Sequence, residues 1–350
     1  RRRSPMFERS QIPAVTPAEV DADKAAQGQV HLFDVREPDE YRAVRAQAGG
    51  FLDLVYNPEL AAEVTLQPIR RFGFDAAILF SDILVIPHAL GRNVRFVAGE
   101  GPQLDPIGGE KEIEALNVAD TAKKLGPVFE TLKFVKKDLP AAVTLIGFCG
   151  APWTVATYMI AGRGGDDQEA AKIMAYTQPQ LFTKLIDKLV ESSVIYLVAQ
   201  LKAGADCVQI FDSWSGALDS FAFEKFVIAP TKKIVDGVRA QIPNAKIIGF
   251  PRGAGSLARF YASMTGVTAL GIDWQQDLAI CAEEIKLPLQ GNLDPLRLFG
   301  SHETLRDMIS CMKRTMRGKP YIFNLGHGIT PQTPIESVEH MLHAVRETGP

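Results

Sequence analysis

The sequence lacks features that mark several large classes of protein. Only four of its 350 residues are cysteine, and they form no CxxC pair and no Cys/His cluster with zinc spacing. This usage favours a reduced, cytoplasmic compartment. No apolar run reaches the roughly 18 residues that a membrane-spanning helix needs. The formal net charge is only −3, which gives no sign of nucleic-acid or membrane-surface binding.

Motifs of common catalytic machinery are also missing. There is no P-loop, no GxGxxG turn, no GxSxG elbow, no HExxH motif and no His-x-Cys pair. The sequence therefore predicts no metal and no cofactor. It favours chemistry that depends on acid–base groups and electrostatics.

The apolar residues are concentrated in short continuous runs bounded by Gly, Pro or charged residues. Eight such runs are rich in Val, Ile and Phe: 30–35, 76–82, 143–148, 207–211, 246–250, 269–273, 287–292 and 321–326. Continuous runs are typical of parallel strands buried on both faces. With helical segments between them, they predict an α/β fold, a single-domain (β/α)8 TIM barrel. A doubly wound open sheet is the alternative, which the missing GxGxxG turn disfavours.

Two of the helical segments are clearly delimited. In 57–73, Asn57 is a candidate N-cap, Pro58 is the first helical position and Gly73 ends the helix. Between residues 179 and 203, leucines and β-branched residues keep near-helical spacing. This pattern predicts a helix with one face toward the core.

The active site of such a barrel lies at the carboxyl ends of its strands. The polar residues that follow the predicted strands are Arg36, Ser81, Asp82, Cys149, Asp212, Ser213, Arg252, Asp273, Asn292, Asp294, Asn324 and His327. Many barrels would show a comparable set. It locates the mouth of a barrel without naming a reaction.

Three of the polar residues in these segments have two interpretations each. Asp82 ends a very apolar segment, where a carboxylate needs hydrogen-bond donors or its pKa rises. It either caps the following turn or acts as an anion for ligand N–H groups or a cation. His327, between glycines, is an exposed loop residue or a ligand contact. Tyr158 is a buried tyrosine with a satisfied hydroxyl or a site residue.

Arginine is used unevenly along the chain. Residues 31–100 contain seven arginines and no lysine. Arginine suits bidentate recognition of carboxylates better than lysine does. Surface solvation accounts for most of these arginines equally well, and two or three suffice to line a pocket.

Five segments resemble, in order, motifs of the uroporphyrinogen decarboxylase family: FGFDAAILFSDILVIPHALG, GFCGAPWTVATYMIAGRGG, VQIFDSWSGAL, LQGNLDP and FNLGHGITP. The resemblance covers about residues 40–350. It implies a single (β/α)8 barrel, a cytoplasmic homodimer, and no metal or prosthetic group. The implied reaction removes four acetate carboxyl groups from uroporphyrinogen III, giving coproporphyrinogen III in haem and porphyrin biosynthesis.

The resemblance also implies roles for individual residues. Asp82 matches the aspartate that hydrogen-bonds the pyrrole N–H groups and stabilises the cation formed when a pyrrole carbon is protonated. The implied substrate-binding residues are Arg45 at the pocket rim, Phe211 as an apolar wall, and Tyr158, Ser213 and His327 near the substrate's carboxylates or Asp82. The substrate is a polyanion, so arginines at the mouth attract and orient it.

The resemblance fails at the first strand. The family carries RQAGRYLPEYR there, and only EYRAVR (40–45) remains. Counted back without a gap, the family's second arginine falls on Arg36, another candidate substrate-binding residue, and its first falls on Leu32. The loss of one charged anchor is expected to cost about 1.5–3 kcal/mol.

A different resemblance replaces the motif. Residues 15–41 are similar to the start of a rhodanese-type sulfurtransferase domain. That domain needs a cysteine in a later loop, and the first cysteine here is Cys149. We therefore expect a disordered start over 1–14, a rhodanese-like fragment over 15–41 whose run at 30–35 supplies the first barrel strand, and a decarboxylase-like barrel over 42–350.

Four functions follow from these observations. The first is an active decarboxylase in which Arg36 and Arg45 replace the lost arginine. The second is a porphyrinogen-binding protein with impaired catalysis. The third is a cobamide-linked methyltransferase, which shares the fold but needs a zinc site that the sequence lacks. The last is a rhodanese-like adaptor, for which the chain has no complete domain.

Overall fold

The computed structural model describes residues 44, 47–97, 101–165 and 168–347. Its main sheet has seven strands in the order β1-β4-β5-β6-β7-β8-β9, all parallel to their neighbours. They are β1 (Ala76–Ile78), β4 (Thr144–Gly150), β5 (Cys207–Asp212), β6 (Ile247–Pro251), β7 (Ala269–Gly271), β8 (Leu289–Leu293) and β9 (Tyr321–Leu325). Each strand overlaps one predicted run. The eighth run, 30–35, lies outside the described residues, as do the segments 1–14 and 15–41.

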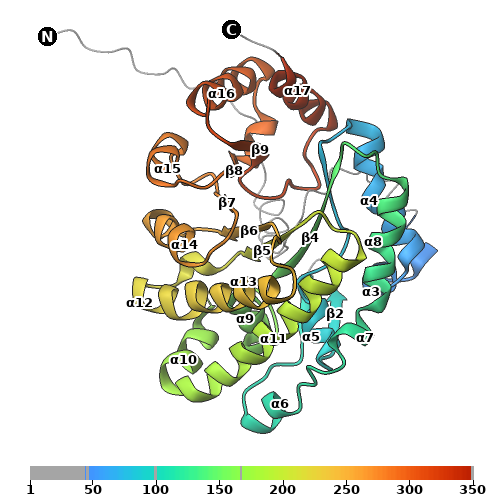
Figure 1. Ribbon diagram of the computed structural model, residues 1–350, viewed down its shortest axis with the longest axis vertical. Helices are drawn as coiled ribbons and strands as arrows, with labels where there is room; N and C mark the ends of the chain where they lie inside the picture. Colours follow the sequence, from blue (N-terminus) through green and yellow to red (C-terminus); the bar gives the residue numbers. More distant parts are fainter. Residues whose placement is uncertain (1–43, 45–46, 98–100, 166–167, 348–350) are drawn as a thin grey trace, which may run out of the picture.

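The helices surround this sheet, as Figure 1 shows. The longer ones are α4 (Pro58–Phe72), α8 (Gly126–Asp138), α9 (Pro152–Ala161), α10 (Glu169–Thr177), α11 (Pro179–Ala203), α13 (Ala229–Gln241), α16 (His302–Thr315) and α17 (Ile335–Arg346). The shorter ones are α3 (Phe51–Val55), α5 (Val85–Ala89), α6 (Glu110–Glu114), α7 (Thr121–Lys124), η2 (Ser215–Ala217), α12 (Ser220–Phe223), η3 (Glu224–Ile228), η4 (Gly255–Leu257), α14 (Ala258–Met264), α15 (Leu278–Glu284) and η5 (Pro295–Phe299).

Strand order decides between the two predicted architectures. Among the described strands of the main sheet, each is hydrogen-bonded to the next one along the chain, and the order never reverses. A doubly wound sheet reverses its order at a switch point. The curled parallel sheet with its surrounding helices is therefore a TIM-barrel-like fold, as predicted.

The two delimited helices begin and end as predicted. Helix α4 starts at Pro58, where the Asn57 side chain accepts a hydrogen bond from the Leu60 N–H at 3.1 Å. It ends before Gly73, whose φ of 60° lies in the left-handed region that glycine adopts most easily. Helix α11 spans residues 179–203 and buries one leucine-rich face. Local capping chemistry and periodicity were sufficient to define both helices.

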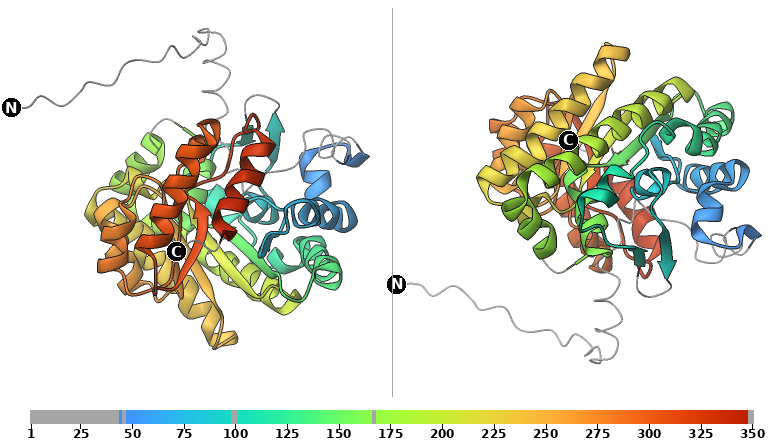
Figure 2. Two further views of the ribbon diagram at one scale, coloured as in Figure 1. Left: turned by 90° about the horizontal axis from the view of Figure 1, so that it is seen from above. Right: turned by 90° about the horizontal axis from the view of Figure 1, so that it is seen from below.

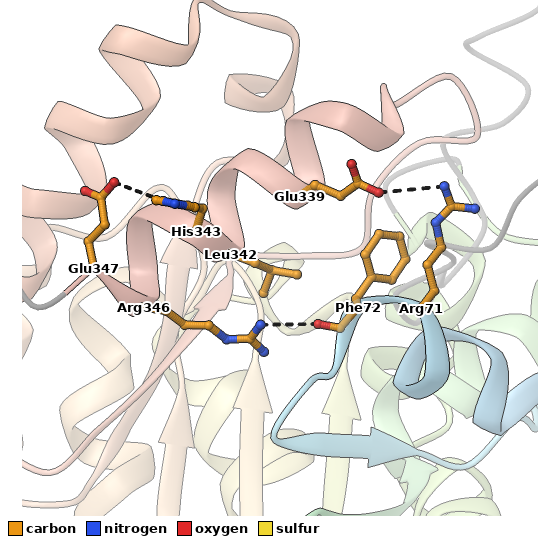
Figure 3. A pocket seen from close by; sticks show the side chains of 7 residues that line it. All are labelled: Arg71, Phe72, Glu339, Leu342, His343, Arg346 and Glu347. Atoms are coloured by element: carbon orange, nitrogen blue, oxygen red, sulfur yellow. Dashed lines mark hydrogen bonds and ion pairs between the residues drawn. The ribbon is translucent and has the colours of Figure 1, made fainter.

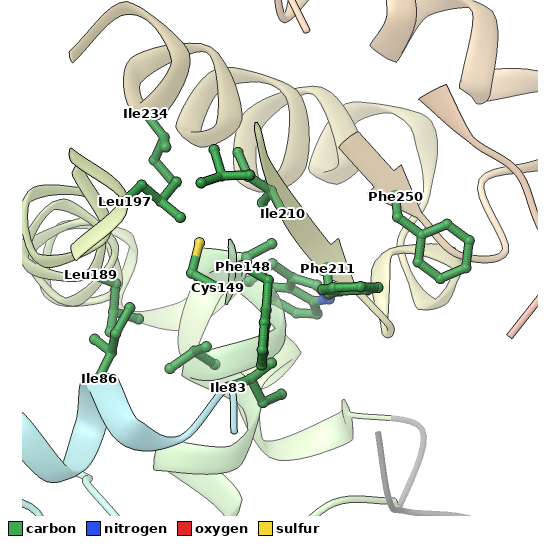
Figure 4. Packing of buried hydrophobic residues seen from close by; sticks show 14 of the residues in the cluster. Ile83, Ile86, Phe148, Cys149, Leu189, Leu197, Ile210, Phe211, Ile234 and Phe250 are labelled. Carbon is green, nitrogen blue, oxygen red and sulfur yellow. The ribbon is translucent and has the colours of Figure 1, made fainter. Parts of the chain in front are cut away.

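The strands carry different side chains on their two faces. Cys149 and Ile210 pack among Leu197 of α11 and Ile234 of α13 on the outer face (Figure 4). Because side chains alternate along a strand, Phe211 points to the inner face. Its partners in the register there are Gly150 of β4 and Phe250 of β6. The inner face at this level is therefore aromatic.

The helices at the two ends of the sheet contact each other. Arg346 of α17 donates hydrogen bonds to the carbonyl oxygens of Phe72 and Gly73, at the end of α4. Arg71 of α4 forms an ion pair with Glu339 of α17 at 3.7 Å. Figure 3 shows these side chains around a cavity of about 790 Å³. The ring of helices thus continues between the edge strands β1 and β9, and Figure 2 shows it from two further sides.

One element was not predicted. Strands β2 (Val94–Val97) and β3 (Gly101–Leu104) form a separate antiparallel pair after α5. Within the part of the chain that the structure describes, no helix has the length and apolar content needed to cross a membrane.

Candidate active site at the carboxyl ends of the strands

Asp82 lies just beyond β1, in a segment that α4 holds in place. The Thr65 hydroxyl of α4 accepts a hydrogen bond from the Phe80 N–H at 2.9 Å and donates to the Ala61 carbonyl at 2.8 Å. Ile78 is paired in register with Ile146 of β4. Asp82 follows the end of β1 by four residues, so it lies at the carboxyl end of the sheet.

Asp82 is partly exposed, and its carboxyl group has one hydrogen bond within the described chain. Its Oδ1 accepts from the Leu84 N–H at 2.7 Å. Burial raises the pKa of Asp82 to about 7, and the Leu84 N–H opposes part of that rise. The capping interpretation is therefore correct for Oδ1. Oδ2 has no hydrogen-bond partner among the described residues and is the oxygen left to serve a ligand.

Three tyrosines lie within electrostatic reach of Asp82. Burial raises the pKa values of Tyr56, Tyr158 and Tyr196, and the negative charge of Asp82 raises them further. The Tyr56 hydroxyl is 2.8 Å from Nδ1 of His88, and the Tyr196 hydroxyl is 3.3 Å from the Ser81 hydroxyl. The carboxylate is thus surrounded by tyrosines that stay neutral. Sequence reasoning had identified Tyr158 but neither of the others.

The end of β5 provides an apolar wall and a polar rim. The Phe211 ring lies 5.7 Å from that of Phe148 and 5.9 Å from that of Phe250, edge-on to both. Ser213, two residues further, is 6% exposed, and its Oγ has no hydrogen-bond partner in the described chain. Oε1 of Gln290 likewise has no hydrogen-bond partner in the described chain. Gln290 is 7% exposed and is paired in register with Gly271 of β7. Buried polar atoms are rarely left unsatisfied, so both are candidates for contact with a ligand.

Asp212, between Phe211 and Ser213, faces the outer side. It is fully buried, and its Oδ1 accepts a hydrogen bond from the Thr154 hydroxyl at 2.5 Å. The Thr154 oxygen accepts in turn from the Trp214 N–H at 3.1 Å. Burial raises the pKa of Asp212 to about 7, partly offset by its hydrogen bonds with Thr154. Asp212 therefore connects β5 to α9, and we assign it no contact with a substrate.

Trp274 and His327 line the ends of the later strands. Their rings are edge-on at 6.2 Å, and the Arg252 guanidinium lies 5.1 Å from the centre of the Trp274 ring. On the other side of Ser213, the rings of Trp214 and Tyr158 are 6.5 Å apart. A series of neighbouring side chains thus follows the mouth of the barrel from Asp82 to His327.

The structure brings five of the seven predicted site residues to this end of the barrel: Asp82, Tyr158, Phe211, Ser213 and His327. The roles predicted for these five residues stay predictions. Arg36 and Arg45 lie outside the described residues. Within the described ranges, no three His, Cys, Asp or Glu side chains are grouped so that they could hold a metal ion.

Comparisons with known proteins agree in one family. The model of the family described as uroporphyrinogen decarboxylase matches residues 35–348. The chain is 56% identical over 308 residues to proteins named uroporphyrinogen decarboxylase from Brucella canis and Brucella suis, covering 88% of this chain and 90% of each relative.

Two solved structures share the fold. A methyltransferase from Methanosarcina mazei aligns with a TM-score of 0.73 and 22% identity, over 87% of this chain and 89% of that one. A putative vitamin-B12-independent methionine synthase from Listeria monocytogenes aligns with a TM-score of 0.55 and 11% identity, over 91% and 97%. At these identities the likeness concerns the barrel fold alone.

Proposed function

The chain belongs to the uroporphyrinogen decarboxylase family, and we propose that the mouth of its barrel decarboxylates uroporphyrinogen III around Asp82. The protein is a carboxy-lyase of porphyrin biosynthesis. It converts the four acetate side chains of its substrate to methyl groups, giving coproporphyrinogen III. The observation that carries the role of Asp82 is its partly buried carboxylate, whose pKa burial raises to about 7 and whose second oxygen has no partner among the described residues.

The chemistry needs an electron sink and a fixed anion. Protonation of a pyrrole carbon makes a cation, which accepts the electron pair of the C–CO2 bond when that bond breaks. Protonation of the resulting methylene carbon then gives the methyl group, and loss of the added ring proton restores the pyrrole. A buried carboxylate stabilises the cation more than a solvated one would, since the surroundings screen it less.

The walls suit a tetrapyrrole with a polar periphery. The faces of its pyrrole rings are apolar, and the rings of Phe211 and Phe250 offer an apolar surface of matching kind, with Phe148 packed behind Phe211. Its pyrrole N–H groups converge at the centre, where Asp82 supplies an acceptor. We propose that Tyr158, Ser213 and His327 contact the carboxylates or the surroundings of Asp82, with Arg36 and Arg45 at the rim.

The altered motif at residues 32–36 favours one alternative, a porphyrinogen-binding protein with impaired catalysis. Both functions are tested by anaerobic incubation with uroporphyrinogen III, with the released CO2 and the oxidised products measured. We expect the chain to form coproporphyrinogen III, and a version with the RQAGRYLPEYR motif restored to act about tenfold to a hundredfold faster.

Each other outcome has a distinct meaning. Equal rates would show that the altered motif impairs nothing. Turnover by the restored version alone would favour the binding-only alternative, and turnover by neither would contradict the decarboxylase assignment. The homodimer and the lack of affinity for nucleic acid also stay predictions. Sedimentation velocity with and without a DNA duplex tests both.

A further inference from the structure

Arg252 occupies the rim of the barrel directly after β6. Its backbone N–H donates to the Asp212 carbonyl at 3.0 Å. Its own carbonyl accepts from the Gly216 N–H at 3.0 Å and from the Ser215 hydroxyl at 2.8 Å. Arg252 is the first residue after β6, at the carboxyl end of the strand. Its backbone is therefore fixed from two directions.

The guanidinium of Arg252 is half-buried and rests on an aromatic face. Its central carbon lies 5.1 Å from the centre of the Trp274 ring, and the Trp274 ring is edge-on to His327. Such a cation–π contact orients the planar guanidinium without using its N–H donors. The donors of Arg252 therefore stay available at the mouth.

No carboxylate of the described chain neutralises this cation. Arg252 makes no ion pair within 4.0 Å among the described residues. Burial lowers the pKa of Arg252, and the negative charge of Asp273 opposes part of that lowering. The two Asp273 oxygens, however, accept from the backbone N–H groups of Gly253 at 2.6 Å and Gln275 at 2.9 Å. A partly desolvated cation without its own carboxylate favours an anionic ligand.

A second donor without a partner comes from the neighbouring strand end. Asp212 and Pro251 are paired in the β5–β6 register, and Ser213 and Arg252 are the residues that follow them in the chain. The Oγ of Ser213 is buried and has no hydrogen-bond partner in the described chain. A hydroxyl and a guanidinium at two adjacent strand ends are donors that a carboxylate can accept from.

We propose that the Arg252 guanidinium, held against Trp274 and assisted by the Ser213 hydroxyl, binds a side-chain carboxylate of the substrate. The inference rests on the proposed function for the identity of that substrate as a tetrapyrrole polyanion. It gives the barrel a substrate-binding cation between β5 and β7, apart from the arginines near the first strand.

The test measures binding rather than turnover, so it also covers the binding-only alternative. The dissociation constant of uroporphyrinogen III is determined by anaerobic calorimetry for the unmodified chain and for Arg252→Gln. We expect Arg252→Gln to bind about tenfold to a hundredfold more weakly, as for the loss of a charge-assisted hydrogen bond. Arg252→Lys keeps the charge without the planar fork and is expected to lie in between.

Arg259→Gln is the matched control. The guanidinium carbon of Arg259 also lies over an aromatic ring, 4.9 Å from the centre of Phe260. Arg259 is exposed on helix α14, however, and forms an ion pair with Glu284 at 3.6 Å. We expect its dissociation constant to equal that of the unmodified chain. A purely structural role of Arg252 would leave the salt dependence of binding unchanged, whereas loss of an ionic contact makes it shallower.

The outcomes separate this inference from the proposed function. If Arg252→Gln binds within about twofold of the unmodified chain, or binds weakly with unchanged salt dependence, the role of Arg252 is overturned while the decarboxylase assignment stands. If Arg252→Gln fails to fold, Arg252→Lys decides by the same criteria. If the unmodified chain neither binds nor converts uroporphyrinogen III, both proposals fail.

Discussion

Two aspartates with similarly raised pKa values, Asp82 and Asp212, have different surroundings. Burial raises the pKa of Asp82 and that of Asp212 to about 7. Each has one oxygen without a hydrogen-bond partner in the described chain, but Asp82 is partly exposed after β1, whereas Asp212 is fully buried on the outer face of β5 and accepts from Thr154. A raised pKa alone would therefore not have singled out Asp82 as the candidate catalytic residue.

The raised pKa of Asp82 predicts how activity depends on pH. Below about pH 7 the carboxyl group is increasingly protonated and cannot stabilise a cation. We therefore expect kcat/KM for uroporphyrinogen III to rise as pH increases through about 7 and then to level off. The profile is measured from about pH 5.5 to 8.5. Asp212→Asn is the control, and its kcat/KM is expected to rise with pH over the same range. A profile that falls over this range would contradict an ionised Asp82.

The raised pKa of Asp212 makes a prediction about stability. A carboxyl group whose pKa is higher in the folded than in the unfolded protein, where it is about 3.9, stabilises the fold when protonated. That stabilisation is lost as pH rises from about 4 to about 7. Asparagine does not titrate, so the melting temperature of Asp212→Asn relative to the unmodified chain should increase between about pH 5 and pH 8.

Exposed Asp236, which pairs with Lys232 on α13, provides the control for this comparison. Asp236→Asn should show no such increase over the same pH range. A melting-temperature difference for Asp212→Asn that stays constant with pH would mean that Asp212 is already ionised in the folded protein under acid conditions.

At the scale of elements, the loops after β5 and β6 hold each other in place. A Cβ on Gly216 would lie 2.6 Å from the carbonyl oxygen of Gly253 and 2.8 Å from its Cα, so the backbone next to Arg252 would have to shift. We expect Gly216→Ala to destabilise the protein by about 1–3 kcal/mol and to weaken binding of uroporphyrinogen III. Thermal melting and calorimetry measure the two effects.

Gly108→Ala is the matched control, because a Cβ there would meet no atom within 4 Å. It should leave both melting and binding unchanged. If Gly216→Ala binds as tightly as Gly108→Ala, the close approach of the two loops has no part in positioning Arg252.

The elements were predictable where local chemistry determines them. The N-cap of Asn57, the Pro58 start and the Gly73 end define α4 without any long-range contact. The continuous apolar runs identified each described strand of the main sheet because both of its faces are covered. The hairpin of β2 and β3 was missed because its four-residue strands, such as Val94–Val97, carry no comparable run.

The neighbours within the site were not predictable in the same way. Tyr56 and Asp82 come from elements separated by the whole of α4, and Arg252 meets Trp274 only because β6 and β7 are adjacent. Hydrophobic periodicity predicts that strands exist, but it does not say which side chains meet at their ends. The positions after the strands already singled out Ser213 and His327, and the family resemblance gave them and Tyr158 their roles, but neither source supplied Tyr56 or Trp274.

For the whole molecule, sequence and structure agree on one barrel with its polar residues gathered at one mouth. The order of the strands follows the chain, which brings residues as distant as Asp82 and His327 to the same end. The family match begins at residue 35 and so includes both Arg36 and Arg45. The rhodanese-like interpretation of residues 15–41 and the strand at 30–35 stay predictions, because these residues lie outside the described part of the chain.

The role of Asp82 is tested most directly by single-turnover decarboxylation of uroporphyrinogen III with Asp82→Asn. Asparagine keeps the size of the side chain but removes the negative charge, and its single oxygen serves either the Leu84 N–H or the pyrrole N–H groups, so one hydrogen bond of about 0.5–1.5 kcal/mol is lost. We therefore expect release of CO2 to slow by about a hundredfold to a thousandfold, with the dissociation constant changed by less than about tenfold. Release of CO2 by Asp82→Asn at the rate of the unmodified chain would contradict the role of the Asp82 charge.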